Sequence, residues 1–204
     1  MSKELNFIQE LVGCFGFPVA ENPTQAMIEP AFAAMGLDWR YLTLEVKPEN
    51  LKAAVAGARA FGFRGFNCTI PHKINVIRHL DGLGQSAELM GAVNCIVRRQ
   101  DQLIGENTDG KGFVSSFKEI DDPAGKRIVI FGAGGAARAI AVELALSGAA
   151  KITLVNRTPQ RGLETKALLD DQLDVATELI TWDKPYAIPE GTDFLINATS
   201  IGLY

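Results

Sequence analysis

The sequence is poor in the residues that mark disulfide-rich and metal-binding proteins. It contains three cysteines in 204 residues, none of them in a CxxC pair, so neither a disulfide framework nor a zinc site is indicated. We expect Cys14, Cys68 and Cys95 to be reduced, as in a cytoplasmic protein. The two histidines, His72 and His79, are expected on one face of a single helix, but no third ligand is evident, and we expect no metal site.

Charge and hydropathy exclude further classes. The net charge is −4, whereas a general nucleic-acid binder usually presents a basic face. No apolar run approaches the roughly 20 residues that cross a bilayer. The polar start of the chain also lacks the apolar core of a signal peptide. We therefore expect a cytoplasmic globular protein that binds neither nucleic acid nor membranes, and we take it to be a monomer or a homodimer.

Strand-like and helical segments alternate along the chain, as in α/β proteins. The first half predicts strands at 12–16, 39–46, 65–70, 92–98 and 102–105, and helices at 24–35, at 48–61 and from Pro71. The second half predicts helices at 107–120, 136–147 and 159–169, and strands at 127–131, 151–155, 178–182 and 193–198. We place the domain boundary between about 107 and 125, and assign residues 1–110 and 111–204 to two domains. The chain stops without the helix that usually covers a parallel sheet, so we expect the second domain to be incomplete at its C-terminal end.

A glycine-rich loop follows the first strand of the second domain. Strand 127–131 runs into Gly132-x-Gly134-x-x-Ala137, the pattern by which Rossmann-type domains bind a dinucleotide. Gly132 permits a tight turn, Gly134 permits close approach of the pyrophosphate, and the next helix directs its first N–H groups at the phosphates. A plain glycine-rich turn is the alternative. We expect a doubly wound parallel sheet whose cofactor contacts are Gly132, Ala133, Gly134, Gly135 and Ala136.

The turn after the next strand indicates which dinucleotide is bound. An NAD site usually places a carboxylate there, which binds the ribose 2′-hydroxyl group. Here the strand ends in Asn156-Arg157-Thr158-Pro159-Gln160-Arg161, without a carboxylate and with two guanidinium groups that suit phosphate oxygens. The turn therefore favours NADP, and the alternative is a solvated basic turn.

Three polar clusters are unusual for plain loops. Lys73, in Asn67-Cys68-Thr69-Ile70-Pro71-His72-Lys73, stands at the positive start of a helix, where a lysine is electrostatically unfavourable. Asn94, after Gly91-Ala92-Val93, interrupts an apolar strand. The third cluster is Gly105-Glu106-Asn107-Thr108-Asp109-Gly110, where Asn107 or Thr108 could cap a helix and Asp109 could be an ordinary first-turn acid.

Together with Asn197-Ala198-Thr199-Ser200, these motifs resemble those of the shikimate dehydrogenase family over nearly the whole chain. The resemblance implies an N-terminal α/β domain that binds a cyclic polyol carboxylate, a Rossmann domain that binds NADP, and an active site in the cleft between them. It also implies a role in aromatic amino acid biosynthesis, with Lys73 and Asp109 as the catalytic pair. By the same resemblance the substrate would contact Asn67, Thr69 and Asn94, and the cofactor would contact Asn156, Arg157, Thr158, Arg161, Thr199, Ser200 and Ile201.

The expected reaction interconverts 3-dehydroshikimate and shikimate, or a related cyclic polyol acid such as quinate. Hydride transfer to a ketone builds negative charge on its oxygen, which Lys73 can neutralise as a proton donor or as a cation. A neighbouring Asp109 carboxylate would keep the ammonium group charged. In the oxidation direction water or Asp109 would have to take the proton, and the sequence leaves both open.

One loop departs from the family pattern. The substrate-carboxylate loop of the family usually reads Ser-x-Ser-Pro, whereas Asn22 and Thr24 stand at the serine positions here, next to the acidic Glu21. Both can still hydrogen-bond a substrate, so shikimate, quinate, an aminated analogue and another cyclic polyol all stay open. A non-catalytic NADP-binding or regulatory protein of the same fold is the competing class. The altered loop and the early stop favour that class, and the presence of Lys73 and Asp109 favours an enzyme.

Overall fold

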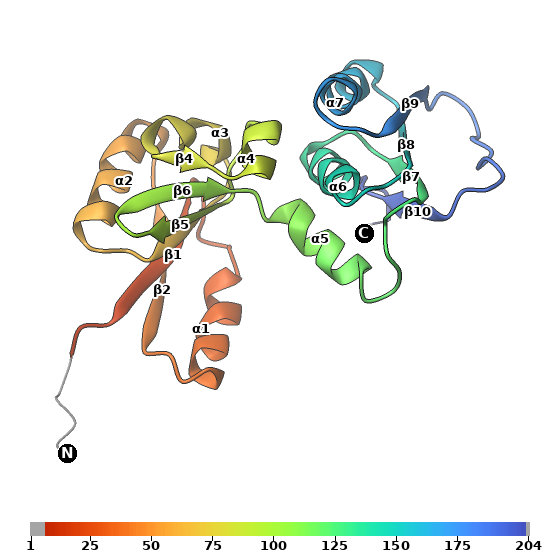
Figure 1. Ribbon diagram of the computed structural model, residues 1–204. Coiled ribbons are helices and arrows are strands. Elements are labelled where there is room, and N and C mark those ends of the chain that lie inside the picture. The colour runs from red at the N-terminus through yellow and green to blue at the C-terminus, as the bar shows by residue number, and fades with distance from the viewer. Residues whose placement is uncertain (1–6, 203–204) are drawn as a thin grey trace. The chain divides into compact units, whose positions relative to one another are not determined.

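The computed structural model describes residues 7–202, which divide by their internal contacts into two units (Figure 1). The first contains the described residues up to Ala87 together with Gly91–Glu106, and the second contains Glu88–Met90 and the residues from Asn107 onward. Each unit is built on a sheet of its own.

The first unit is a mixed six-stranded sheet in the order β2-β1-β3-β5-β6-β4. Its strands are β1 (Glu10–Gly16), β2 (Trp39–Glu45), β3 (Gly65–Cys68), β4 (Gly82–Leu83), β5 (Cys95–Arg99) and β6 (Gln102–Glu106). β1 pairs in parallel with β2 and β3, whereas β5 runs antiparallel to β3 and β6. The carboxyl ends of β1, β2, β3 and β6 therefore lie at the same edge of the sheet as the amino end of β5.

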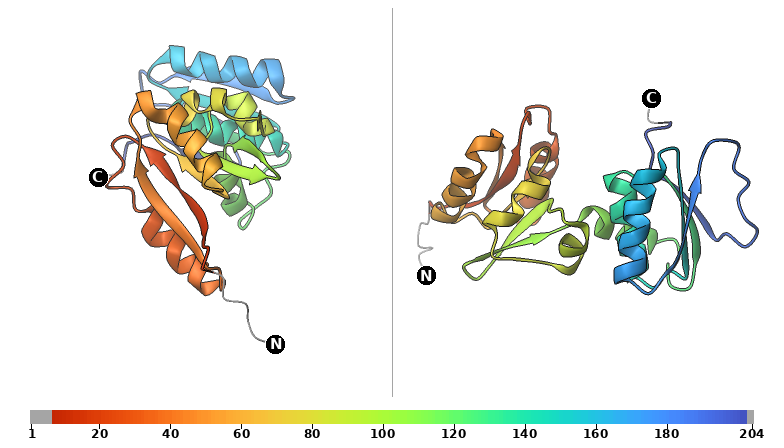
Figure 2. Two further views of the ribbon diagram at one scale, coloured as in Figure 1. Left: turned by 90° about the vertical axis from the view of Figure 1, so that its left-hand side faces the viewer. Right: turned by 90° about the horizontal axis from the view of Figure 1, so that it is seen from above.

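Helices cover both faces of this sheet (Figure 2). They are α1 (Thr24–Ala34), α2 (Leu51–Ala60), α3 (His72–Asn75) and α4 (Gln85–Met90), with 3₁₀ turns at Pro48–Asn50 and Ile77–His79. Successive side chains of β1 point to opposite faces. Phe15 packs with Val55 of α2, and Cys14 packs with Ile28 and Phe32 of α1. The core of the first unit therefore has a larger part under α2 and a smaller part under α1.

The second unit is a four-stranded parallel sheet in the order β10-β7-β8-β9. Its strands are β7 (Arg127–Phe131), β8 (Lys151–Asn156), β9 (Ala176–Thr181) and β10 (Phe194–Asn197), and its helices are α5 (Asp109–Phe117), α6 (Gly135–Leu146) and α7 (Pro159–Gln172). The chain order reverses between β7 and β10, which is where Rossmann-type sheets bind their ligands. The predicted α/β fold, with a Rossmann-type parallel sheet in the second half, is confirmed.

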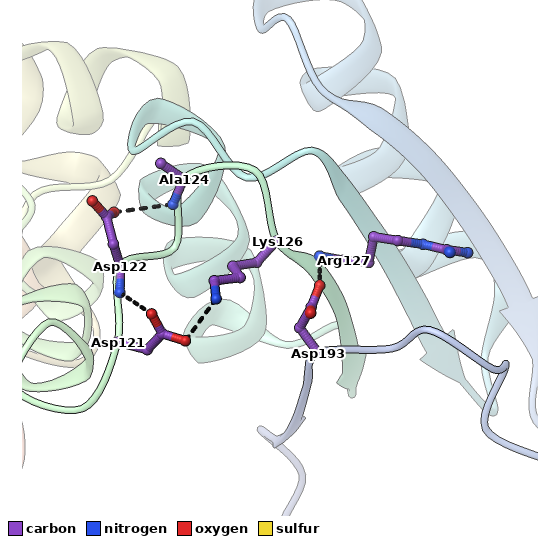
Figure 3. Close-up of polar contacts among 6 residues, drawn as sticks. All are labelled: Asp121, Asp122, Ala124, Lys126, Arg127 and Asp193. Carbon is purple, nitrogen blue, oxygen red and sulfur yellow. Dashed lines mark hydrogen bonds and ion pairs between the residues drawn. The ribbon is translucent and has the colours of Figure 1, made fainter.

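Polar contacts tie the start of this sheet to the segment that follows α5 (Figure 3). Lys126 Nζ lies 2.7 Å from Asp121 Oδ2, and the N–H of Asp122 donates to Asp121 Oδ1 at 2.7 Å. The hydrogen bond from Lys126 holds the pKa of the Asp121 carboxyl group below its ordinary value. The N–H of Arg127 donates to Asp193 Oδ2 at 2.7 Å. These contacts fix the starting points of β7 and β10, whose carboxyl ends carry the candidate cofactor loops.

Some sequence-based expectations about local structure were wrong. α3 ends at Asn75 and His79 belongs to a separate 3₁₀ turn, so His72 and His79 do not share a helix. A 3₁₀ turn has three residues per turn, so a seven-residue spacing no longer places two side chains on one face. β4 and α4 were not predicted, because elements of two and six residues are too short for a clear periodic pattern.

None of the helices within residues 7–202 is long and apolar enough to cross a membrane. Among the same residues, no three His, Cys, Asp or Glu side chains gather in a set that could hold a metal ion. Cys14 and Cys68 are buried, whereas Cys95 is half-buried. Trp39 packs on Phe32, with ring centroids 5.5 Å apart.

The contact between α5 and α6 depends on a glycine. A Cβ atom on Gly110 would lie 2.2 Å from the carbonyl oxygen of Ala139, whereas a Cβ on Gly112 of the same helix would meet nothing within 4 Å. We expect Gly110→Ala to lower the free energy of unfolding, measured by urea denaturation, by about 1–3 kcal/mol, because the added methyl group would force the backbones of α5 and α6 apart. Gly112→Ala is the matched control and should be neutral or stabilising by up to about 1 kcal/mol. Equal stabilities of the two variants would contradict this packing.

Candidate functional site

The residues predicted to bind the substrate gather at one edge of the first sheet. Asn67 lies in β3 and Thr69 directly follows it, while Asn94 directly precedes β5. The carbonyl oxygen of Asn94 accepts the N–H of Cys68 at 2.9 Å, and the N–H of Asn94 donates to the carbonyl of Glu106 at 3.1 Å. The expectation that Asn94 interrupts a strand was therefore wrong. Asn94 lies just before β5, and its backbone is hydrogen-bonded to the last residues of β3 and β6.

Asn67 is held by hydrogen bonds at both ends of its amide group. The hydroxyl group of Tyr41 donates to Asn67 Oδ1 at 2.9 Å, and Asn67 Nδ2 donates to the carbonyl oxygen of Asn94 at 3.2 Å. Tyr41 is 3% exposed, and its burial raises the pKa of the phenol, which stays protonated. Sequence reasoning missed Tyr41, because a tyrosine within a strand is indistinguishable from an ordinary packing residue.

The loop after β1 forms one wall of a cleft of about 420 Å³. The cleft is lined by Pro18, Val19, Ala20, Glu21, Asn22, Thr69 and Ile70. Asn22 Oδ1 accepts the N–H of Thr24 at 3.0 Å, and Asn22 Nδ2 donates to Cys14 Sγ at 3.9 Å. Thr24 begins α1 and is half-buried. The charged group among the cleft's lining residues is the carboxylate of Glu21.

Lys73 is the second residue of α3 and is half-buried. Its carbonyl oxygen accepts the N–H of Val93 at 2.8 Å, which joins α3 to the segment that carries Asn94. The neighbouring His72 is 1% exposed, and its Nε2 lies 2.7 Å from the carbonyl oxygen of Val46, just past β2. His72 therefore anchors α3, and the lysine beside it is positioned at the same edge of the sheet as Asn67 and Asn94.

The buried thiols near Lys73 stay protonated. Burial raises the pKa of Cys14 and Cys68, and it raises that of Cys68 to about 12. The positive charge of Lys73 acts in the opposite direction on both thiols, but the effect of burial is larger. At neutral pH these cysteines act as packing and hydrogen-bonding groups and not as nucleophiles.

Asp109 is the first residue of α5 in the second unit and is exposed. Its N–H donates to Asn107 Oδ1 at 3.2 Å, so the side chain of Asn107, which is 3% exposed, shapes the start of the helix. Thr108 occupies the N-cap position, but its side chain makes no capping hydrogen bond. Of the two expected caps, Asn107 is therefore the one whose side chain bonds the helix start.

The glycine loop between β7 and α6 fits a pyrophosphate. Gly132 has a φ of +113°, and a Cβ atom there would lie 2.8 Å from the carbonyl oxygen of Ala198, so both conformation and space require glycine. Gly134 and Gly135 are exposed, and a Cβ on either would meet nothing within 4 Å. Open space thus lies beside the N-terminus of the 12-residue α6. Ala137 is fully buried and keeps α6 against the sheet.

Arg157 and Thr158 are exposed in the turn after β8, and Arg161 is exposed in the first turn of α7. Asn156 Nδ2 donates to the carbonyl oxygen of Thr158 at 2.8 Å, which fixes the path of the turn. β8 neighbours β7 in the sheet, so this basic turn starts at the same edge as the glycine loop. The arrangement suits an anionic group on the adenosine ribose.

The loop after β10 lies on the other side of β7. Asn197 Oδ1 accepts the N–H of Thr199 at 3.0 Å and its hydroxyl group at 2.7 Å. The N–H of Ile201 donates to Thr199 Oγ1 at 3.0 Å, and Ser200 is exposed. The predicted cofactor residues of the second unit therefore follow three adjacent strands at a single edge of its sheet.

Two family models match the chain. Residues 14–96 match the shikimate dehydrogenase substrate binding domain, and residues 116–202 match the shikimate / quinate 5-dehydrogenase model. Among curated proteins, the chain is 43% identical over 201 residues to the shikimate dehydrogenase (NADP(+)) of Geobacter metallireducens. That alignment covers 95% of this chain and 69% of the Geobacter protein.

Two solved structures are also similar. The ligand-free 5-ketofructose reductase of Gluconobacter sp. strain CHM43 is 53% identical with a TM-score of 0.94, covering 97% of this chain and 71% of that one. The shikimate 5-dehydrogenase of Listeria monocytogenes in complex with shikimate and NAD is 33% identical with a TM-score of 0.87. It covers 100% of this chain and 73% of the Listeria chain.

Proposed function

Because the chain belongs to the shikimate dehydrogenase family of NAD(P)-dependent oxidoreductases, we propose that it reduces an uncharged polyhydroxy ketone, such as 5-ketofructose, with NADPH. The observation that carries this proposal is the 53% identity to a 5-ketofructose reductase along 97% of the chain. The identity to the Listeria enzyme solved with shikimate is 33%. Side chains that determine a substrate are shared more often at the higher identity.

The loop after β1 supports an uncharged substrate. A carboxylate brought into the cleft would meet the carboxylate of Glu21, and like charges a few ångströms apart repel even near solvent. 5-Ketofructose carries hydroxyl and carbonyl groups and no carboxylate. Glu21 therefore does not repel this substrate, and its carboxylate can accept hydrogen bonds from the hydroxyl groups. Asn22 and Thr24, at the serine positions of the family pattern, offer an amide and a hydroxyl group to such a substrate.

A second candidate is the interconversion of 3-dehydroshikimate and shikimate, or of the corresponding quinate pair. The 43% identity to the Geobacter enzyme favours it, as do Asn67, Thr69 and Asn94, which stand in motifs of that family. The two candidates share a reaction class and a cofactor, and they differ in whether the substrate carries a negative charge. That charge is the property on which the test below depends.

NADP is the proposed cofactor. Arg157, in the turn after β8, and Arg161, in the first turn of α7, are exposed where a 2′-phosphate would lie, and the turn has no carboxylate that would repel it. Because the Listeria relative was solved with NAD, the proposed preference for NADP over NAD rests on this basic turn and not on that comparison. Gly134 and Gly135 would hold the pyrophosphate, and Thr199, Ser200 and Ile201 would flank the nicotinamide.

In the proposed reaction Lys73 and Asp109 are the catalytic pair. The cofactor, when bound, supplies the hydride that reduces the ketone carbon. Negative charge grows on the ketone oxygen, and Lys73 Nζ neutralises it by donating a proton. Asp109 is the proposed partner that orients the ammonium group. Asn67, Thr69 and Asn94 hold the hydroxyl groups of the substrate.

The first test compares substrates and cofactors in one assay. The nicotinamide absorbance is followed with 5-ketofructose and 3-dehydroshikimate, each with NADPH and NADH. We expect kcat/KM with NADPH to be at least about tenfold higher for 5-ketofructose, the scale on which a mismatched polar group is rejected. A preference for 3-dehydroshikimate would refute the uncharged substrate. NADPH binding without turnover of either ketone would identify a non-catalytic protein.

The second test concerns the proton donor. Lys73→Ala is expected to lower kcat at least about a hundredfold, the usual contribution of a positioned acid. The Kd of NADPH, measured by calorimetry, should stay nearly unchanged, because the lysine belongs to the first unit. Lys52→Ala, which removes an exposed lysine from α2 of the same unit, is the matched control and should leave kcat unchanged. Near-normal turnover of Lys73→Ala would remove this residue from the mechanism.

A further inference from the structure

Lys73, the proposed proton donor, stands in a helix that is too short to hold itself in place. α3 has four residues, and its N-terminus has no side-chain capping hydrogen bond. A single helical turn forms few internal hydrogen bonds and is not stable on its own in water. The position of Lys73 therefore depends on contacts between α3 and the rest of the first unit.

His72, which precedes Lys73 in α3, makes a polar contact of this kind. It is 1% exposed, and its Nε2 lies 2.7 Å from the carbonyl oxygen of Val46. A carbonyl oxygen can only accept, so Nε2 carries the hydrogen and donates it. A second anchor is apolar, because Val76, directly after α3, is fully buried in the larger core of the unit. Along the chain, Lys73 lies between these two anchors.

The backbone of Val46 extends this contact to the candidate substrate loop. The N–H of Val46 donates to the carbonyl oxygen of Gly16 at 2.9 Å, while its own carbonyl oxygen accepts the hydrogen of His72. Gly16 is the last residue of β1, and the loop that follows it carries Glu21. One residue after β2 thus connects the loop that lines the cleft to the helix that carries Lys73.

Without the hydrogen bond from His72, the carbonyl group of the buried Val46 would lose its donor, which is unfavourable away from water. α3 would shift, and Lys73 would move with it. Proton transfer requires the donor within hydrogen-bond distance of the ketone oxygen, and a displacement of about 1 Å can slow a reaction about a hundredfold. We propose that His72 is a positioning residue, whose hydrogen bond to Val46 holds Lys73 where it protonates the ketone oxygen. This inference rests on the proposed function, in which Lys73 is the proton donor.

The test is His72→Phe, which keeps a planar ring and removes the N–H donor. With NADPH and the ketone that the wild type prefers, we expect kcat to fall at least about tenfold. KM for the ketone should stay within about threefold, because Asn67 and Asn94 are held by contacts outside α3. His79→Phe, the same substitution at the other histidine of the chain, is the matched control and should leave kcat unchanged. Wild-type kcat in His72→Phe would overturn the inference.

His72→Gln and His72→Asn separate the hydrogen bond from the shape of the side chain, and they replace His72→Phe if that variant does not fold. Glutamine extends about as far as the histidine Nε2 and can donate to Val46, so kcat should stay within about threefold of the wild type. Asparagine is too short to reach Val46 and should lower kcat as phenylalanine does. Equal kcat values in His72→Gln and His72→Asn would overturn the role of the hydrogen bond.

A combination with Lys73→Ala shows whether His72 acts through the lysine. Adding His72→Phe to Lys73→Ala should lower kcat no further, because its effect is exerted through the absent ammonium group. A further loss of about tenfold in the double variant would overturn the inference. A large loss in Lys73→Ala beside full activity of His72→Phe would overturn this inference alone. Near-normal turnover of Lys73→Ala would overturn the proposed mechanism and this inference with it.

Discussion

A buried phenol has to be hydrogen-bonded, and the geometry of the candidate substrate site depends on how the Tyr41 hydroxyl group meets that requirement. Leaving such a group unpaired costs about 1–3 kcal/mol. Tyr41 satisfies it through Asn67, which is also bonded to the backbone carbonyl of Asn94. The position of β2 therefore controls the orientation of a side chain in β3.

The same principle of sheet geometry organises both units. Parallel strands bring their carboxyl ends to one edge, so residues far apart in the sequence become neighbours there. In the first unit Asn67 and Asn94, with 26 residues between them, meet at this edge because β5 runs antiparallel to β3 and begins where β3 ends. In the second unit Gly132 packs against Ala198, the first residue of a loop that begins 66 positions later in the chain. In the proposed function, the ketone binds at this edge of the first sheet and the cofactor binds at the carboxyl edge of the second sheet.

Much of this arrangement could be predicted from the sequence. The strand–glycine–helix pattern at 127–147 is local, and the structure has β7 and α6 within one residue of the predicted bounds. The polar clusters around Lys73, Asn94 and Asp109 were found because each departs from the residue types expected at its position.

Tyr41, Cys14 and His72 could not be found in this way. A tyrosine in a strand, a cysteine in an apolar run and a histidine beside a proline are all ordinary, and their roles come from contacts with residues distant in the sequence. Asn94 was wrongly predicted within a strand because the residues on both sides of it, among them Val93 and Ile96, are apolar. In the structure β5 begins one residue later, and the backbone of Asn94 bonds to Cys68 and Glu106. Side-chain type suggested which residues take part in the chemistry, whereas the tertiary contacts determined how they are held.

The central claim is that this chain reduces an uncharged polyhydroxy ketone, with Glu21 in the cleft after β1 disfavouring a substrate carboxylate. The ratio of kcat/KM for 5-ketofructose to kcat/KM for 3-dehydroshikimate, measured with NADPH, tests this claim most directly. The account predicts a ratio of at least about ten. A ratio below one would contradict it.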